Sequence, residues 1–249
     1  MVNFLLKKSY QINNLKILKF KDLWGSFGVF TTIRLIGKPG KLILFQSHFN
    51  GLIKSLRKYK IYNKKLEKVV RHLINLNINK NFNYDHLLRV ALTKKDISIS
   101  IRKRLKPKKN FELKIINYKR IDPLTKNLYY KKILKELNKY DPSKIDIALV
   151  YKGKILETCT SNILFFKDNE YFSPKNDCYI GNTIKYLKGK IKISFQDIYY
   201  KDLKKFEEIM LIGSGKGVTP VKYIKEINWK SKNNSGYKKI NKYLNFKSL

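Results

Sequence analysis

The chain has 249 residues, with 55 lysines and arginines against 18 aspartates and glutamates, which gives a formal net charge of +37. This length is sufficient for two modest domains, each with its own core. Two cysteines, Cys159 and Cys178, are too few for a disulfide framework, and no apolar run is long enough for a transmembrane helix. The short apolar start is interrupted by Lys7 and Lys8, so no signal peptide is predicted. We expect a cytoplasmic protein without membrane association.

The charge by itself would predict attraction to nucleic acid. However, the basic residues are dispersed along the chain, and only seven are arginine against 48 lysines. There are also only two alanines, whereas isoleucine, asparagine and tyrosine, whose codons are rich in A and T, are abundant. We interpret the charge as base-composition drift onto solvated positions, and we expect no specific nucleic-acid partner.

The first half of the chain alternates predicted strands and helices. Residues 27–36 alternate with the period of a strand, and the glycine-proline turn at 37–40 leads into a second strand at 42–45. Helices are predicted over 47–58, capped by Ser47, and over 63–76. Further strands are predicted over 87–92, 97–101 and 111–116. The pattern breaks at 117–123, which we predict to separate a smaller N-terminal domain, residues 1–118, from a larger C-terminal domain, residues 122–249.

The second half also mixes the two element types, so the predicted fold class is α/β, of the α+β type, with a mixed sheet and helices in each domain. A helix over 129–139 is predicted just after Lys126, and a hairpin over 145–166 follows. Beyond the hairpin, we predict a helix opening at Asn182, a helical segment over 201–207 and a terminal helix over 235–244. Strands are predicted over 191–195, 209–212 and 221–224.

The predicted hairpin contains the most informative motif, Glu157-Thr158-Cys159-Thr160-Ser161-Asn162, followed by an apolar strand. The simplest interpretation of such a motif is an Asx or Ser/Thr turn at the start of a strand. A carboxylate at this position should be paired, because an unpaired buried charge is costly. Cys159 has no histidine nearby in sequence, and we interpret it as a small substitute for serine or threonine.

Four further motifs accompany this one in a fixed order. They are the strand Gly28–Arg34, Lys126, the turn Gly181-Asn182-Thr183, and Gly213-Ser214-Gly215 followed by Thr219-Pro220-Val221. Together the five motifs resemble those of the fold-type IV pyridoxal-phosphate enzymes. That family includes branched-chain and D-amino-acid aminotransferases and aminodeoxychorismate lyase.

The resemblance implies roles for individual residues around pyridoxal 5′-phosphate (PLP). Lys126 would form the imine with the cofactor and serve as a general base, and Glu157 would hold the pyridine nitrogen protonated. The phosphate would be bound by Asn182, Thr183, Ser214 and Gly215, since backbone N–H groups at a helix start suit an anion. Tyr130 would bond the ring hydroxyl, with a core aromatic role as the alternative. A two-domain homodimer acting on a small molecule, without a metal, is also implied.

Two positions depart from the family pattern. In the His-x-x-Arg-Leu segment, whose arginine binds the phosphate, Gly51 replaces the arginine. Either Lys54 or the backbone compensates, or the cofactor binds weakly. Tyr129 stands where the family often has an asparagine. This difference affects the expected fine geometry around Lys126 and not the identity of the lysine.

Thr32 discriminates between members of the family. Branched-chain aminotransferases commonly have glycine at this place and D-amino-acid aminotransferases an apolar residue, whereas the lyases have threonine. The resemblance therefore favours a lyase of folate biosynthesis that releases pyruvate and 4-aminobenzoate from 4-amino-4-deoxychorismate, with Thr32 assisting the leaving group. Arg89, Arg102 and Arg104 are candidates for binding the substrate carboxylates. The alternatives are an aminotransferase acting on branched-chain or D-amino acids, and a decayed or nucleic-acid-binding protein.

Overall fold

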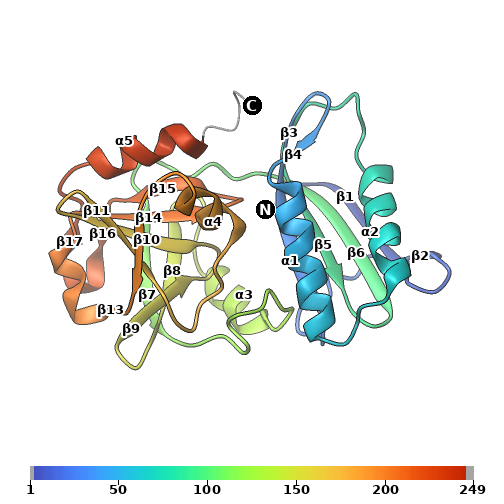
Figure 1. Cartoon of the computed structure of the whole chain (residues 1–249), viewed down its shortest axis with the longest axis horizontal. Helices are drawn as coiled ribbons and strands as arrows, with labels where there is room; N and C mark the ends of the chain where they lie inside the picture. The colour runs from blue at the N-terminus through green and yellow to red at the C-terminus, as the bar shows by residue number, and fades with distance from the viewer. Residues whose placement is uncertain (1–2, 245–249) are drawn as a thin grey trace. The chain divides into compact units, whose positions relative to one another are not determined.

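The computed structural model describes residues 3–244 and divides the chain into two compact units (Figure 1). The first unit comprises the chain up to Arg104 together with Thr125–Lys131. The second comprises Leu105–Leu124 and the chain from Lys132 onward. Both units combine sheets with helices, so the predicted mixed α/β class is confirmed.

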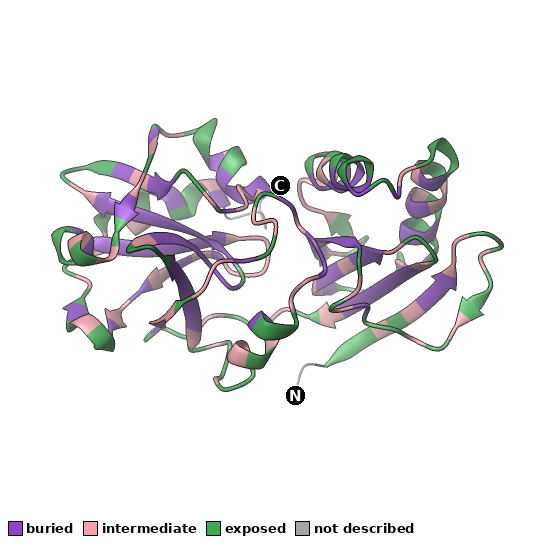
Figure 2. Cartoon of the chain, turned by 90° about the horizontal axis from the view of Figure 1, so that it is seen from below, coloured by how far each residue is buried: buried purple, intermediate pink, exposed green. Residues whose placement is uncertain are grey.

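The first unit is built on one antiparallel sheet, the N-terminal sheet, in the order β2-β1-β6-β5-β3-β4. Its strands are β1 (Phe4–Gln11), β2 (Ile17–Leu18), β3 (Val29–Gly37), β4 (Lys41–Leu42), β5 (Tyr84–Leu92) and β6 (Asp96–Lys103). Its helices are α1 (Phe45–Lys58) and α2 (Lys64–Leu76). The central strands are largely buried, and the outward turns of the helices are exposed (Figure 2).

The two helices of the first unit cover one face of the N-terminal sheet. Val29, Ile33 and Leu35 of β3 pack there in one core with Leu52 of α1 and Val70 of α2. These β3 positions are separated by even numbers of residues, because alternate side chains of a strand point to the same face. The opposite face of β3 therefore carries the even-numbered side chains.

The ends of these helices differ in how well the sequence predicts them. The Asn63 side chain accepts a hydrogen bond from Leu66 N at 2.8 Å and caps α2, as the pattern predicts. Helix α1 begins at Phe45 because Leu44 adopts a left-handed conformation with φ 53°. The predicted strand at 42–45 is wrong for this reason, since β4 ends at Leu42.

The second unit has two sheets, in the orders β12-β11-β10-β14-β15 and β13-β9-β8-β7-β16-β17. The strands of the first are β10 (Asn162–Lys167), β11 (Glu170–Pro174), β12 (Ile193–Gln196), β14 (Glu208–Gly213) and β15 (Gly217–Val221). Those of the second are β7 (Glu112–Asn117), β8 (Ile145–Tyr151), β9 (Lys154–Thr158), β13 (Ile198–Tyr199), β16 (Tyr223–Ile224) and β17 (Trp229–Lys230). Leu113, Phe165 and Leu211 bring both sheets into one buried core.

Helices occupy the connections and the end of the second unit. They are α3 (Lys131–Leu137), α4 (Asn182–Lys188) and α5 (Ser235–Asn241), with 3₁₀ turns η1 (Tyr200–Lys205), η2 (Lys225–Ile227) and η3 (Lys242–Leu244). No helix among residues 3–244 is long and apolar enough to cross a membrane.

The structure divides the chain differently from the predicted boundary at 117–123. Strand β7 pairs in parallel with β8, so the residues before Leu124 join the second unit. The following segment pairs with β3 instead: Phe30 N donates to Lys126 O and Leu128 N donates to Gly28 O, both at 2.9 Å. These bonds hold Lys126 in the first unit, in an extended segment. The predicted helix start at 129 is also wrong, because α3 begins at Lys131.

Candidate active site

Lys126 lies beside β3 with its ammonium group over an aromatic ring. The Nζ atom is 4.9 Å from the centroid of Phe30, a distance typical of a cation–π contact. The flanking residues Thr125 and Asn127 are buried, so the backbone on both sides of the lysine is fixed. A lysine held in this way can present its amine to a bound molecule without losing much conformational entropy.

Thr32 is on the same face of β3 as Phe30, and Arg34 is the next residue on that face. Thr32 pairs with Arg89 of β5, and Arg34 lies in one row with Leu87 and Arg102 of β6. Residues directly opposite one another in a sheet share a face. Phe30, Thr32, Arg34, Arg89 and Arg102 therefore line the face of the N-terminal sheet away from α1 and α2, which we call the polar face.

The polar face carries more guanidinium groups than carboxylates. Arg34 Nη2 and Arg104 Nη1 approach the same oxygen, Asp85 Oδ1, at 3.8 and 3.9 Å. The Nε atoms of Arg34 and Arg89 are buried and have no hydrogen-bond partner within the described part of the chain. Such unpaired buried donors are costly unless a ligand satisfies them. The predicted residue Arg102 belongs to this face, whereas Arg104 is engaged with Asp85.

Burial disfavours the positive charge of these arginines. It is the main cause that lowers the pKa of Arg34, of Arg102 and of Arg104, and it lowers that of Arg89 to about 9. Neighbouring guanidinium groups also lower the pKa of Arg34 and Arg89, whereas the carboxylates of Asp85 and Asp22 raise the pKa of Arg34 and Arg89, respectively. An anion bound at the polar face would relieve both effects, because an opposite charge favours the protonated form.

Aromatic rings surround this part of the polar face. Trp24 lies 4.9 Å from Phe30 and 5.6 Å from Tyr130, measured between ring centroids, and the Arg89 guanidinium stacks over Trp24 at 3.6 Å. Tyr130 also contacts Phe30 edge-on at 5.3 Å. The ring of Tyr130 thus has the aromatic packing role that we considered as its alternative, and the role of its hydroxyl toward a cofactor stays a prediction.

On the opposite face of β3, Thr31 contacts His48 of α1. Thr31 Oγ1 and His48 Nδ1 are 3.0 Å apart, and both residues are buried. Burial, followed by the charge of Lys126, lowers the pKa of His48 to about 3. His48 is therefore neutral at physiological pH, and it lies within the electrostatic influence of Lys126.

This shift predicts acid sensitivity. An unfolded histidine has a pKa of about 6.5, so below that pH the unfolded state binds a proton that the folded state does not. The free energy of unfolding should therefore decrease by about 1–2 kcal/mol between pH 6.5 and 5 from this group alone. His48→Asn, which keeps a polar group near Thr31, should flatten this slope in urea titrations. The control, exposed His72→Asn on α2, should keep the wild-type slope, and equal slopes in all three proteins would contradict the assignment.

Gly51 leaves α1 without the arginine of the family pattern, and two lysines on this helix are nearby in sequence. Lys54 is exposed. Lys58 lies two helical turns beyond Gly51, on the same side of the helix. Its Nζ donates a hydrogen bond of 2.8 Å to Oγ1 of Thr125, next to Lys126.

In the second unit, Glu157 is buried at the end of β9 and paired with an arginine. Arg120 Nε donates to Glu157 Oε1 at 2.7 Å, and Tyr179 N approaches the other oxygen at 3.4 Å. Arg120 Nη2 also donates to Pro123 O at 2.7 Å, which fixes the guanidinium. The expected pairing of this carboxylate is present, but the sequence did not identify Arg120. Arginine is scarce in this chain, and the occurrence of one within the irregular segment 117–123 is the signal that could have identified it.

Asn162, at the end of the glutamate motif, holds the start of α4. Its Oδ1 accepts from Gly181 N at 2.9 Å, and its Nδ2 donates to Tyr179 O at 2.6 Å. A Cβ atom at Gly181 would lie 2.8 Å from Asn162 Oδ1, so this close approach requires glycine. Two of the predicted motifs, distant in sequence, are thus in direct contact.

The residues of α4 fit the phosphate group that the resemblance implies. Asn182 and Thr183 form its first turn, which has no acidic residue and no side-chain cap at Gly181. The first N–H groups of a helix have no partner within the helix and favour an anion. Ser214 and Gly215 belong to the turn between β14 and β15, in the same unit.

Cys159 is buried in the glutamate motif. Burial, and then the charges of Asp146 and Glu157, raise the pKa of its thiol, so the thiol stays protonated. Because the thiolate is the reactive form, Cys159 is not suited to act as a nucleophile.

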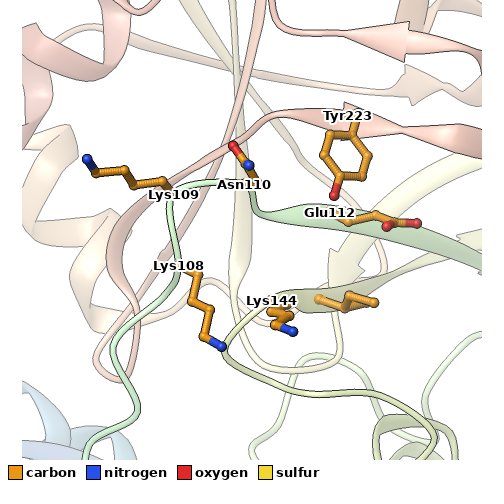
Figure 3. Close-up of a pocket in the computed structure, with 7 residues that line it drawn as sticks. Lys108, Lys109, Asn110, Glu112, Lys144 and Tyr223 are labelled. Carbon is orange, nitrogen blue, oxygen red and sulfur yellow. The ribbon is translucent and has the colours of Figure 1, made fainter.

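The second unit also contains an open pocket of about 340 Å³, and none of its lining residues is a predicted site residue. Figure 3 shows the side chains that line it. They are those of Lys108, Lys109, Asn110, Glu112, Lys144, Ile145 and Tyr223. Lysines are too abundant in this chain for three of them to indicate a ligand, and the Glu112 carboxylate is already paired with Lys114 and Lys225. No group of three His, Cys, Asp or Glu side chains suited to a metal occurs among residues 3–244.

Comparisons with known proteins agree with the five motifs. The family model for amino-transferase class IV matches residues 28–224. A search of curated protein sequences gave no match. The branched-chain aminotransferase of Thermoproteus uzoniensis has a similar structure, with a TM-score of 0.77, 17% identity, and coverage of 97% of this chain and 94% of that one.

Two further solved structures are similar in fold. A candidate 4-amino-4-deoxychorismate lyase from Legionella pneumophila has a TM-score of 0.70 and 16% identity, over 88% of this chain and 90% of its own. A hypothetical aminotransferase from Mycobacterium tuberculosis in its PLP-bound form has a TM-score of 0.68 and 14% identity, over 95% and 96%. At these identities the likeness concerns the fold.

Proposed function

Since this chain belongs to the class IV aminotransferase family, whose enzymes use PLP, we propose that it is a lyase of this family. The proposed reaction splits 4-amino-4-deoxychorismate into pyruvate and 4-aminobenzoate. The observation that carries the proposal is the position of Thr32 on the polar face, between Phe30, which Lys126 contacts, and the arginines Arg34 and Arg89.

The reaction needs a base and an acid at different atoms. Bound PLP would supply an electron sink for the carbanion formed at the aminated carbon. Lys126 would remove the proton from that carbon, and Thr32 would donate a proton to the oxygen of the departing enolpyruvate. The C–O bond to enolpyruvate breaks, and the ring becomes aromatic. Glu157, paired with Arg120, would hold the ring nitrogen of the cofactor protonated, while Asn182, Thr183, Ser214 and Gly215 would bind its phosphate.

The arginines of the polar face support a substrate with two carboxylates. Arg34 and Arg89 each have a buried Nε without a partner within residues 3–244, and Arg102 lies in the same row as Arg34. Guanidinium groups bind carboxylates in a fixed, two-pronged geometry. Aminodeoxychorismate brings one carboxylate on its ring and one on its enolpyruvyl group, so both could be neutralised at this face.

A second candidate is an aminotransferase that acts on branched-chain or D-amino acids. The packed rings of Trp24, Phe30 and Tyr130 favour it, because an apolar side chain could pack against them. An apolar side chain would, however, leave the Nε atoms of Arg34 and Arg89 without a hydrogen-bond partner among residues 3–244. The homodimer that the family implies stays a prediction, which sedimentation of the purified protein would test.

The proposed activity is tested by incubating the purified protein, loaded with PLP, with aminodeoxychorismate. We expect pyruvate and 4-aminobenzoate to be released in equal amounts without any keto-acid acceptor. Borohydride reduction of the loaded protein should fix the cofactor on Lys126, as peptide mapping would show. A protein that is inert here but moves an amino group from valine or D-alanine to 2-oxoglutarate would be the second candidate.

We further propose that Lys58 supplies the positive charge that Gly51 lacks. The hydrogen bond to Thr125 places its ammonium group beside the segment of Lys126. A hydrogen bond to a charged group contributes about 1.5–3 kcal/mol, so Lys58→Met should raise the PLP dissociation constant by roughly ten- to a hundredfold. Lys54→Met, equally exposed and one helical turn before Lys58, is the matched control and should bind PLP as the wild type does. Equal affinities of the two variants would exclude Lys58 from this role.

A further inference from the structure

Asp146, on β8, is a buried carboxylate with no assigned role. The residue is fully buried, with 0% of its surface exposed. Its Oδ2 accepts hydrogen bonds from Thr158 Oγ1 at 2.8 Å and Thr160 Oγ1 at 2.6 Å, and its Oδ1 accepts from Ile147 N at 2.8 Å. Two side chains of the glutamate motif are therefore anchored on one oxygen atom.

The same oxygen faces a cation from another turn. Lys216 Nζ lies 3.7 Å from Asp146 Oδ2, and the lysine side chain is only 10% exposed. The ammonium group also lies 4.5 Å from the centroid of the Phe111 ring. Lys216 belongs to the turn between β14 and β15 that contains Ser214 and Gly215. Asp146 thus contacts two turns. One leads to Asn162, which holds the start of α4, and the other contains Ser214 and Gly215.

The hydroxyl of Thr158 shows how this carboxylate shapes its turn. The hydroxyl has one proton, and the shorter of its two donor contacts is the one to Asp146. Its lone pairs then accept from Ser161 N at 2.8 Å, which closes the turn before Asn162. Asn162 in turn holds Gly181 N at the start of α4.

The two turns also pack directly against each other. A Cβ atom at Gly213, where β14 ends, would lie 3.2 Å from Ser161 Oγ. A shift of either turn would therefore displace the other. A buried ion pair is strongly sensitive to the loss of one partner, because the remaining charge is left without compensation.

We propose that Asp146 and Lys216 form a positioning pair, which locks the turn ending at Asn162 to the turn of Ser214 and Gly215 and so sets the spacing of the phosphate ligands. The inference rests on the proposed role of these turns in binding PLP, and it is independent of whether the enzyme is a lyase or an aminotransferase. The pair touches no reacting atom. Its effect should appear in cofactor affinity, because preorganised ligands lose less entropy when they bind.

The test is a double-mutant cycle on the full chain, with Asp146→Asn, Lys216→Met and the double variant. The measured quantity is the PLP dissociation constant, obtained by titration of the cofactor absorbance. Each single variant should weaken PLP binding about tenfold or more, and the double variant should be no weaker than the worse single one, since paired residues act as a unit. The control, Asp202→Asn with Lys205→Met, removes an exposed ion pair of η1 and should leave the affinity unchanged.

A milder pair of variants covers the case in which Asp146→Asn does not fold. Thr160→Val removes one hydrogen bond to Asp146 and should weaken PLP binding several-fold, whereas Thr160→Ser retains the hydroxyl and should restore it. Single variants that unfold at lower temperature but bind PLP like the wild type would overturn the positioning role. A wild-type protein that binds no PLP would instead overturn the proposed function, and the inference with it.

Discussion

Replacing Glu157 by glutamine is expected to keep PLP bound while lowering kcat by about 10²–10³-fold, the loss typical when one preorganised electrostatic group is removed. The neutral amide cannot hold the pyridine nitrogen protonated, so electrons from the substrate would be stabilised less. Pyruvate release by PLP-saturated protein measures kcat, and the absorbance of the bound cofactor reports occupancy. Turnover equal to that of the wild type would contradict the role of Glu157.

The variant also removes the carboxylate charge that pairs with the buried Arg120 guanidinium, so its stability should fall, and cofactor occupancy has to be measured alongside turnover. Glu208→Gln is a matched control. Glu208 is equally buried in the same unit, but its carboxylate accepts from Gly236 N at 2.8 Å and Tyr237 N at 2.9 Å at the start of α5. This control should lose stability and retain its kcat. A similar loss of kcat in both variants would indicate a general effect of removing a buried charge.

Replacing Thr32 by valine is expected to lower the lyase rate by about 10²–10⁴-fold, the range of general-acid assistance. Valine has nearly the same shape and, like threonine, is restricted in χ1, so β3 should be undisturbed. PLP should bind with wild-type affinity, because Thr32 is assigned to the leaving group of the substrate. The readout is the formation of pyruvate in a quenched single turnover, which separates the chemical step from product release.

The neighbouring threonine provides the control for this experiment. Thr31→Val changes the same strand by the same atoms, but on the face that contacts His48. It removes the hydroxyl that contacts the buried Nδ1 of His48 and should cost about 1–3 kcal/mol of stability. Its lyase rate, measured where the protein is folded, should stay within a few-fold of the wild type. If both variants lose the rate equally, Thr32 is not the proton donor.

The sequence by itself determined the features that depend on short-range order. Alternation located β3, the helical period and the Asn63 cap located α2, and the order of the five motifs identified the family. Each of these signals is local, because side-chain periodicity and capping depend on residues a few positions apart. The assignment of Lys126 and Glu157 also came from the sequence, since the spacing between motifs selected Lys126 among 48 lysines.

Only the tertiary structure decided which distant residues meet. Whether Lys126 starts a helix or extends along β3 depends on the hydrogen bonds that Phe30 and Leu128 offer. The partners of the buried charges, Arg120 for Glu157 and Lys216 for Asp146, come from separate strands and turns. Such pairs are set by the order of strands in a sheet and by the need to compensate a charge removed from water. Neither the strand order nor the partner of a buried charge can be deduced from the spacing of residues along the chain.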